Sequence, residues 1–277
     1  MLLLTGATGM VGSELLDGLL AEGRTVRCLV RDPRRLGARR VHVQIALGDL
    51  ADPPSFRNAL RGVDTVVHLA ASTRDQPRGS IEELCAIATW RMVHAAQRAG
   101  AARFLLLSVL GASTHHRSRL FRAKALAEQA VRESALETTV IAPSLVYAGG
   151  DRLMALLERL SHLPAVPIPG TGDAALQPIW VDDVVSAMLT ALRGDPGSID
   201  RLAPATTPAG TSPAGTSAAR ARRFELAGPE TLSFAGVVRA MLAAIGRPRP
   251  LLPVPTPLAA RGLRLMGTAG LLGPLPV

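Results

Sequence analysis

The stretch that decides the fold is LLLTGATGMVG at residues 2–12, where an apolar run passes directly into three glycines spaced three apart. This order predicts a buried strand, a tight turn and a helix. Gly6 would permit the turn, Gly9 would let the backbone approach a pyrophosphate, and Gly12 would let the helix pack closely on the strand. Free N–H groups at the start of such a helix bind anions. A tight turn without a ligand is the alternative.

Apolar runs alternate with helix-period segments to about residue 245, which is typical of βαβ units around a parallel sheet. We therefore expect an α/β fold with a doubly wound parallel sheet. A family resemblance, given below with its motifs, implies that this is a Rossmann sheet with a small C-terminal α/β substrate lobe. The expected strands are Leu2–Leu4, Thr25–Val30, Val41–Ile45, Thr65–Leu69, Arg103–Leu107 and Thr138–Ile141. The expected helices are Val11–Leu20, Pro54–Leu60, Ile81–Ala99, Ser118–Ser134, Arg152–Ser161, Asp183–Leu192 and Phe234–Ile245, with Asp182 or Asp183 as an N-cap.

Changes in composition divide the chain into three parts. Residues 1–193 would form the NAD(P)-binding Rossmann domain, with part of the substrate lobe beginning at about residue 143. Residues 194–223 are rich in Ala, Pro, Gly, Ser and Thr, with PAGTS repeated in tandem at 208–217, and predict a low-complexity mobile linker. Residues 224–277 would complete the C-terminal substrate lobe and end in a Pro-rich tail.

Composition excludes several classes of protein. Cys28 and Cys85 are too few for a disulfide framework or a four-cysteine zinc site, so no metal site is expected and the cytoplasm is the expected location. No apolar run reaches the roughly 18 residues of a transmembrane segment, and the first residues do not resemble a signal peptide. The net charge of +9 comes from scattered Arg, with too few aromatic residues for base stacking, so no nucleic-acid partner is expected.

Residues after the next strands indicate which dinucleotide the turn would bind. Arg31 stands 19 residues after Gly12, where Arg pairs with the 2′-phosphate of NADP and an acidic residue accepts from the ribose of NAD. Arg31 favours NADP(H), and the adjacent Asp32 leaves NAD(H) open. The other cofactor-binding candidates lie in the loop and at the ends of the third and fourth strands: Thr8, Met10, Val11, Asp49, Leu50, Leu69, Ala70 and Ala71.

A series of short motifs, in order, resembles a known family. TGATGMVG, LVRDP, GDL, HLAA, FLLLSVLGA, FRAKALAE, PSLVYAGG, QPIWVDDV and ELAGPETLS occur in this order over about residues 1–245. They resemble the atypical short-chain dehydrogenase/reductases, in particular the NmrA-like group that includes the nucleotide-binding accessory subunit of respiratory complex I. This resemblance implies bound NADP(H) or NAD(H), and the family includes quinone and carbonyl reductases, sugar-nucleotide epimerases and proteins that bind the nucleotide without turnover.

The chain departs from the family at the proton donor. Active members carry Tyr four residues before Lys on one helix, whereas the position four before Lys124 is Leu120. Tyr147 is the only tyrosine and cannot complete that pair. Ser108 matches the family's catalytic serine approximately. His116, in the following loop, is a substitute acid candidate, although such a loop histidine is more often simply exposed.

Lys124 is the only lysine in a chain that otherwise uses Arg. Because Arg is larger and planar, this choice indicates a compact site that needs an ammonium group, and we expect Lys124 to hold ribose hydroxyls. A surface pair with Glu128, four residues on, is the alternative. We expect His68 to be a packed strand-end histidine rather than a catalyst.

These residues lead to competing functional hypotheses. A quinone yields a weakly basic hydroquinone anion, so the missing donor favours a reductase of quinone or conjugated carbonyl acceptors. The alternative is a non-catalytic NAD(P)H-dependent sensor or assembly protein, and the third is a sugar-nucleotide epimerase or dehydratase. The partner would be a small-molecule substrate or a protein. Tyr147 and Trp180 are expected to line the substrate pocket, although core packing is an equal alternative for Trp180.

Overall fold

The computed structural model describes residues 1–77, 79–149, 151–194, 221–255 and 257–258. The chain divides into two compact units, of which unit 1 comprises Met1–Pro143 and Val181–Leu226, and unit 2 comprises Ser144–Trp180 and Ala227–Val277. Most of the expected linker, residues 195–220, and most of the Pro-rich tail lie outside the described residues.

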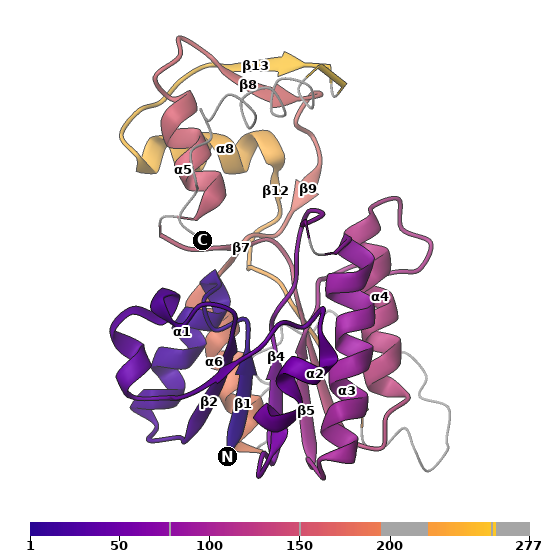
Figure 1. The fold of residues 1–277 in the computed structure, drawn as a ribbon. Helices are drawn as coiled ribbons and strands as arrows, with labels where there is room; N and C mark the ends of the chain where they lie inside the picture. The colour runs from indigo at the N-terminus through magenta and orange to yellow at the C-terminus, as the bar shows by residue number, and fades with distance from the viewer. Residues whose placement is uncertain (78, 150, 195–220, 256, 259–277) are drawn as a thin grey trace. The chain divides into compact units, whose positions relative to one another are not determined.

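A seven-stranded sheet forms the centre of unit 1 (Figure 1). The strand order is β11-β6-β5-β4-β1-β2-β3, and every neighbouring pair is parallel. The strands are β1 Leu2–Thr5, β2 Val26–Val30, β3 Gln44–Leu47, β4 Thr65–His68, β5 Arg103–Leu107, β6 Glu137–Pro143 and β11 Ala221–Leu226. The expected Rossmann doubly wound sheet is therefore confirmed.

Helices cover both faces of this sheet (Figure 1). On one face α1 (Met10–Ala21) packs against α6 (Val181–Arg193). On the other lie α2 (Pro53–Phe56), α3 (Ala88–Arg98) and α4 (Arg119–Arg132), together with a 3-10 turn, η2 (Arg57–Leu60). A π-helical segment, η3 (Glu83–Ile87), leads directly into α3, so the expected helix 81–99 forms with its first turns widened.

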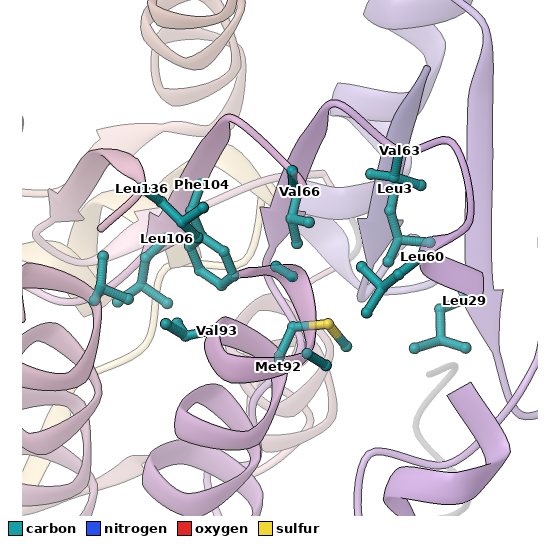
Figure 2. Packing of buried hydrophobic residues seen from close by; sticks show 14 of the residues in the cluster. Leu3, Leu29, Leu60, Val63, Val66, Met92, Val93, Phe104, Leu106 and Leu136 are labelled. Atoms are coloured by element: carbon teal, nitrogen blue, oxygen red, sulfur yellow. The ribbon is translucent and has the colours of Figure 1, made fainter. Parts of the chain in front are cut away.

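The core beneath α3 and α4 forms because alternate strand residues point to the same face. Leu3, Val66, Phe104 and Leu106 lie on neighbouring strands and meet Met92 of α3 (Figure 2). Each of these side chains is at most 1% exposed. Burial of each large apolar side chain contributes about 1.5–3 kcal/mol, so this cluster helps to hold α3 on the sheet.

Three expectations differ from the structure at element boundaries. Val41 ends a 3-10 segment, η1 (Pro33–Val41), and β3 begins only at Gln44, because its first partner on β2 is Arg27. Asp182 and Asp183 lie in the first turn of α6 instead of capping it, where their charges complement the helix dipole. Residues 221–226, expected as linker and lobe, form edge strand β11 on β6.

The described residues of unit 2 form two helices and three short strand pairs. The helices are α5 (Arg152–Leu160) and α8 (Phe234–Ala244), which pack against each other. The parallel pairs are β7 (Val146–Tyr147) with β10 (Ile179–Trp180) and β8 (Val166–Pro169) with β13 (Leu251–Val254), and the antiparallel pair is β9 (Ala175–Leu176) with β12 (Leu232–Ser233). Across the described parts of both units, no helix has the length and apolar character needed to cross a bilayer.

Candidate functional site

The loops after β1 and β4 meet at the middle of the sheet, where the strand order reverses direction. Gly6 has φ +77°, and a Cβ there would lie 2.7 Å from the backbone nitrogen of Ala70. Only glycine permits both the positive φ and this close approach. Ligands of doubly wound folds bind at the carboxyl ends of strands at such a switch point. The expected candidates Leu69, Ala70 and Ala71 therefore lie beside the glycine loop.

The glycine loop opens helix α1 as the sequence predicts. Gly9 is the N-cap, its N–H donates to the Gly6 carbonyl at 3.0 Å, and a Cβ on Gly12 would lie only 2.0 Å from the Gly6 oxygen. Thr8 is half-buried, Met10 is exposed, and Val11 is buried under the helix. The loop combines an accessible backbone with the positive end of a three-turn helix, an arrangement suited to an anion.

The end of β2 presents Arg31 and Asp32 differently. Arg31 directly follows the strand and is exposed. The Asp32 carboxylate accepts a hydrogen bond from the Arg34 N–H at 2.9 Å and caps η1. The acidic group that sequence reasoning considered as a ribose ligand is thus used in a local cap, whereas Arg31 is exposed at the end of the strand.

The end of β3 is braced by a short loop. The Asp49 N–H donates to the Ser55 hydroxyl at 2.8 Å, and the Asp49 carboxylate accepts from the Ala51 N–H at 3.0 Å. Leu50 packs partly against the main core cluster. These contacts hold both residues at the carboxyl edge of the sheet, next along from β2.

His68 is fully buried at the end of β4. Its Nδ1 lies 2.9 Å from the Thr5 hydroxyl on β1, while its Nε2 has no hydrogen-bond partner among the described residues. Burial, with a smaller contribution from the charge of Lys124, lowers the pKa of His68 to about 3. The ring is therefore neutral at physiological pH. These observations confirm a packed strand-end histidine.

Lys124 is buried on α4, and its Nζ donates to the Leu107 carbonyl of β5 at 2.6 Å. Burial lowers its pKa, and the nearby Cys85 and Glu128 partly offset this effect. The alternative of a surface pair with Glu128 is wrong, because both side chains are only 5% exposed and Glu128 bonds elsewhere. The structure places the ammonium group at the carboxyl end of β5, directly before Ser108.

Ser108 belongs to a buried chain of polar groups that sequence reasoning missed. Its hydroxyl donates to one oxygen of Glu128, and the other oxygen accepts from Nε of Arg223 on β11 at 2.9 Å. Arg223 is also paired with Glu225. The position of Glu128 on the apolar stripe of α4 signals burial, but nothing in the sequence pairs it with a strand 95 residues away. The Ser108 hydroxyl hydrogen is thus already bonded to a carboxylate.

The remaining catalytic candidates are separate from this chain of polar groups. Leu120, at the family's tyrosine position, packs against a small buried cluster that includes Cys85 and Ala123. His116 is exposed, stacks on Phe121 at a ring-centroid distance of 4.3 Å, and accepts from the Ser118 N–H through Nδ1. Among the described residues, no cluster of His, Cys, Asp or Glu could hold a metal ion.

Tyr147 and Trp180 meet within unit 2. Parallel pairing of β7 with β10 sets them side by side, with ring centroids 5.1 Å apart at 62°. Both line a cavity of about 480 Å³, whose other walls come from α5, α8 and the segment before β12. The expected pair therefore lies together at a cavity.

Comparison with known proteins identifies the family. Residues 6–163, more than half of the chain, match the model of a family described as NAD(P)H-binding. The chain belongs to this NAD(P)H-binding family. With the strand order above, this match confirms the resemblance to the atypical short-chain dehydrogenase/reductases.

Relatives in the family carry different activities. NAD(P)H azoreductase of Xenophilus azovorans is 29% identical over 90% of this chain and 75% of its own length. Ceramide reductase of Caulobacter vibrioides is 28% identical over 69% of this chain and 60% of its own length. NADH dehydrogenase (ubiquinone) 1 alpha subcomplex subunit 9 of Arabidopsis thaliana is 28% identical over 71% of this chain and 51% of its own length. The chain thus spans about half to three fifths of the latter two.

Solved structures share the fold. A dTDP-glucose 4,6-dehydratase of Streptomyces venezuelae with NAD bound gives a TM-score of 0.73 at 18% identity, covering 92% of this chain and 84% of that one. A nucleoside-diphosphate-sugar epimerase of Staphylococcus aureus gives a TM-score of 0.70 at 17% identity, covering 91% of this chain and 80% of that one. At these identities the likeness concerns the fold of the family.

Proposed function

We propose that this protein binds NADP(H) in the glycine loop of unit 1 and reduces quinones or other conjugated carbonyl acceptors. The observation that carries the proposal is the loop itself. A Cβ on Gly6 or Gly12 would collide with backbone atoms, so the loop is built to expose main chain at a helix N-terminus. Such a cradle fits a diphosphate. The family match supports a nicotinamide dinucleotide as the ligand.

The residues that would hold the dinucleotide form a path along the carboxyl edge of the sheet. Backbone groups of the glycine loop would bind the pyrophosphate, Asp49 and Leu50 would border the adenine, and Lys124 would reach ribose hydroxyls. The proposed set is Gly6, Thr8, Gly9, Met10, Val11, Gly12, Arg31, Asp49, Leu50, Leu69, Ala70, Ala71, Ser108 and Lys124.

Preference for NADP(H) follows from the end of β2. The exposed Arg31 guanidinium is suited to a 2′-phosphate, because its fork of donors matches phosphate oxygens. The adjacent Asp32 carboxylate caps η1, which holds it away from the role of ribose acceptor. NAD(H) lacks the 2′-phosphate, so it would bind the same cradle without an ion pair to Arg31.

A reduced dinucleotide, when bound, supplies a hydride to the acceptor. The residues on β5 and α4 would bind and orient rather than protonate, since Leu120 has no hydroxyl and the Ser108 hydroxyl already donates to Glu128. A quinone fits these residues because its hydroquinone anion is weakly basic and water can protonate it. His116 is the candidate acid for a more basic product, and its exposure gives it access to solvent protons.

Unit 2 would be the substrate lobe, with Tyr147 and Trp180 at its pocket. The buried free thiols of Cys28 and Cys85 support the cytoplasm as the compartment.

Two measurements test this function. Titration with NADPH and NADH side by side should give tighter binding of NADPH. NADPH oxidation should then exceed the protein-free rate with at least one member of a quinone panel. A Gly9→Ala variant, whose added methyl group would enter the cradle, is the matched control. Rates equal to those of this control would remove the enzymatic claim, and equal affinities would remove the NADP preference.

The bond from Ser108 to Glu128 favours a second candidate function, a non-catalytic NAD(P)H-dependent sensor or assembly protein. A serine whose hydroxyl already donates to a carboxylate, in a chain that carries Leu120 at the family's tyrosine position, is poorly suited to the family's acid catalysis. The similarity to a subunit of a mitochondrial complex is consistent with this alternative. It predicts tight NADPH binding, no turnover, and a partner protein that co-purifies only with dinucleotide present. Robust turnover with no such partner would exclude it.

A further inference from the structure

We infer that the cavity of unit 2 takes an apolar, ring-bearing molecule that is neutral or cationic, and that it disfavours anionic ones. This inference rests on the proposed function, because it names the class of acceptor that the reductase would use. It separates this protein from the nucleotide-sugar enzymes that share its fold.

The aromatic wall of the cavity is fixed by strand pairing. Trp180 is opposite Tyr147 in the β7–β10 ladder, and their edge-to-face contact holds the two rings at 5.1 Å. Trp180 is 37% exposed, so it has ring surface available to a ligand. Aromatic pairs of this kind offer flat apolar surface and negative ring faces, which attract other rings and cations.

A second wall is an apolar stripe of α8. Val237, Ala240, Met241 and Ala244 recur at helical spacing and all line the cavity. Met154 of α5 adds a second thioether. Methionine side chains are polarizable and adapt their shape, so they accommodate planar ligands of different outline. The two small alanines keep this wall open.

The rim carries a negative charge. Glu230 is the only ionisable group other than Tyr147 among the described residues that line the cavity. Gly228, just before it, sits so close to the Pro178 carbonyl that a Cβ would lie 1.7 Å from that oxygen, which fixes the path of this segment. A diphosphate needs cationic partners, and the described lining provides a carboxylate instead.

The size of the cavity agrees with this ligand class. At about 480 Å³ it lies within the range of small-molecule pockets. Such pockets are mainly apolar, with few polar groups that fix orientation. Glu230 would be that orienting group, and it would accept a hydrogen bond from an amine or hydroxyl on the ring system.

Two matched dyes test the charge preference. Phenylnaphthylamine is neutral, and anilinonaphthalene sulfonate adds one sulfonate to the same ring system. Fluorescence titration of the full chain should show the neutral dye binding more tightly, by about threefold or more given the exposure of Glu230. Glu230→Gln should bring the two affinities together. Equal affinities in the wild-type protein, or a wild-type preference for the sulfonate, would overturn the inference.

Variants on α8 test whether the dyes bind in this cavity. Ala240→Phe fills the cavity from an exposed position, so the fold should tolerate it, and neutral-dye affinity should fall by about tenfold or more. Ala243→Phe adds the same group on the same helix, outside the cavity lining, and should leave affinity unchanged. Ala244→Phe is the second cavity variant. Equal effects of Ala240→Phe and Ala243→Phe would contradict the inference.

The outcomes separate this inference from the proposed function. If the neutral dye binds in the cavity but no quinone is reduced by NADPH, the proposed reductase activity is wrong and the inferred ligand class still holds. Quinone reduction that Ala240→Phe and Ala244→Phe do not impair would leave the proposed function and overturn the cavity assignment.

Discussion

The Thr5 hydroxyl and Nδ1 of His68 lie 2.9 Å apart, joining β1 to β4 where the direction of the sheet reverses. The two residues are opposite each other in the parallel ladder, and both are at most 1% exposed. The Thr5 hydroxyl also accepts from the Ala70 N–H at 3.4 Å. This contact therefore connects the buried end of the sheet to the loop proposed to border the dinucleotide.

His68 should make stability depend on pH. Its pKa is about 3 in the fold against 6.5 ordinarily, so the unfolded chain binds more protons between these values. The contribution is fully present above pH 6.5 and is lost as pH falls toward 3, at up to about 1.4 kcal/mol per pH unit. In urea unfolding, His68→Gln should flatten this slope, and exposed His115→Gln should not. Parallel curves for wild type and His68→Gln would contradict the assignment.

Substitutions at two glycines of the loop should affect stability and NADPH binding differently. Gly9 has φ −87°, and its Cβ would lie 3.4 Å from the nearest atom outside its neighbours, so Gly9→Ala should change stability by less than about 1 kcal/mol. NADPH affinity should fall by about tenfold or more, because the methyl group enters the cradle. Gly12→Ala should cost about 1–3 kcal/mol of stability through its clash with the Gly6 oxygen. Thermal unfolding measures the stability of each variant, and fluorescence titration measures its NADPH affinity. Unchanged NADPH affinity in Gly9→Ala would refute the proposed cradle.

Arg31 should determine the choice of dinucleotide. Arg31→Asp removes a charge-assisted hydrogen bond to the 2′-phosphate, so NADPH affinity should fall by about tenfold or more while NADH affinity is kept or improved. Arg98→Asp, an exposed charge reversal at the end of α3, is the control for net charge. A uniform loss for both dinucleotides would show that Arg31 does not contact the phosphate.

Lys124 should matter for binding and not for stability. Because burial lowers its pKa, its charge is costly in the fold, and Lys124→Met should leave the free energy of unfolding at neutral pH unchanged or higher. Loss of the ammonium should weaken NADPH and NADH equally, since both carry the same nicotinamide ribose. Calorimetry measures the stability of the variant, and titration measures its affinities for NADPH and NADH. Unaltered affinity for both would assign Lys124 a purely structural role.

The Glu128–Arg223 pair should hold β11 on the sheet. Glu128→Ala leaves the Arg223 guanidinium and the Ser108 hydroxyl without their shared carboxylate, at a cost of about 3 kcal/mol or more. Arg223→Met should cost a similar amount. The double variant should be more stable than the sum of the single losses predicts, because neither Glu128 nor Arg223 is left without the other. Strict additivity in urea unfolding would mean that the pair is not coupled.

The sequence alone predicted the sheet, the glycine turn and most helices, because these depend on local patterns. Residues 2–12 specify a turn that only glycine can make, and the alternation of apolar runs limits the architecture to a few solutions. Tyr147 and Trp180 were assigned to one pocket through the family resemblance, and their ring contact came only from the structure. Boundaries such as Val41 were missed because a strand begins where its partner offers hydrogen bonds.

Only the tertiary structure decided the chemistry at the end of β5. Arg223 follows a low-complexity segment and carries no local signal, yet it lies on β11 and bonds to Glu128 from 95 positions away. The same carboxylate accepts the hydrogen bond of the Ser108 hydroxyl, and the burial of His68 and Lys124 lowers their pKa values. Hydrogen bonding and desolvation act through space, so residues distant in the chain set them, whereas turns and periodicity are properties of neighbours in sequence.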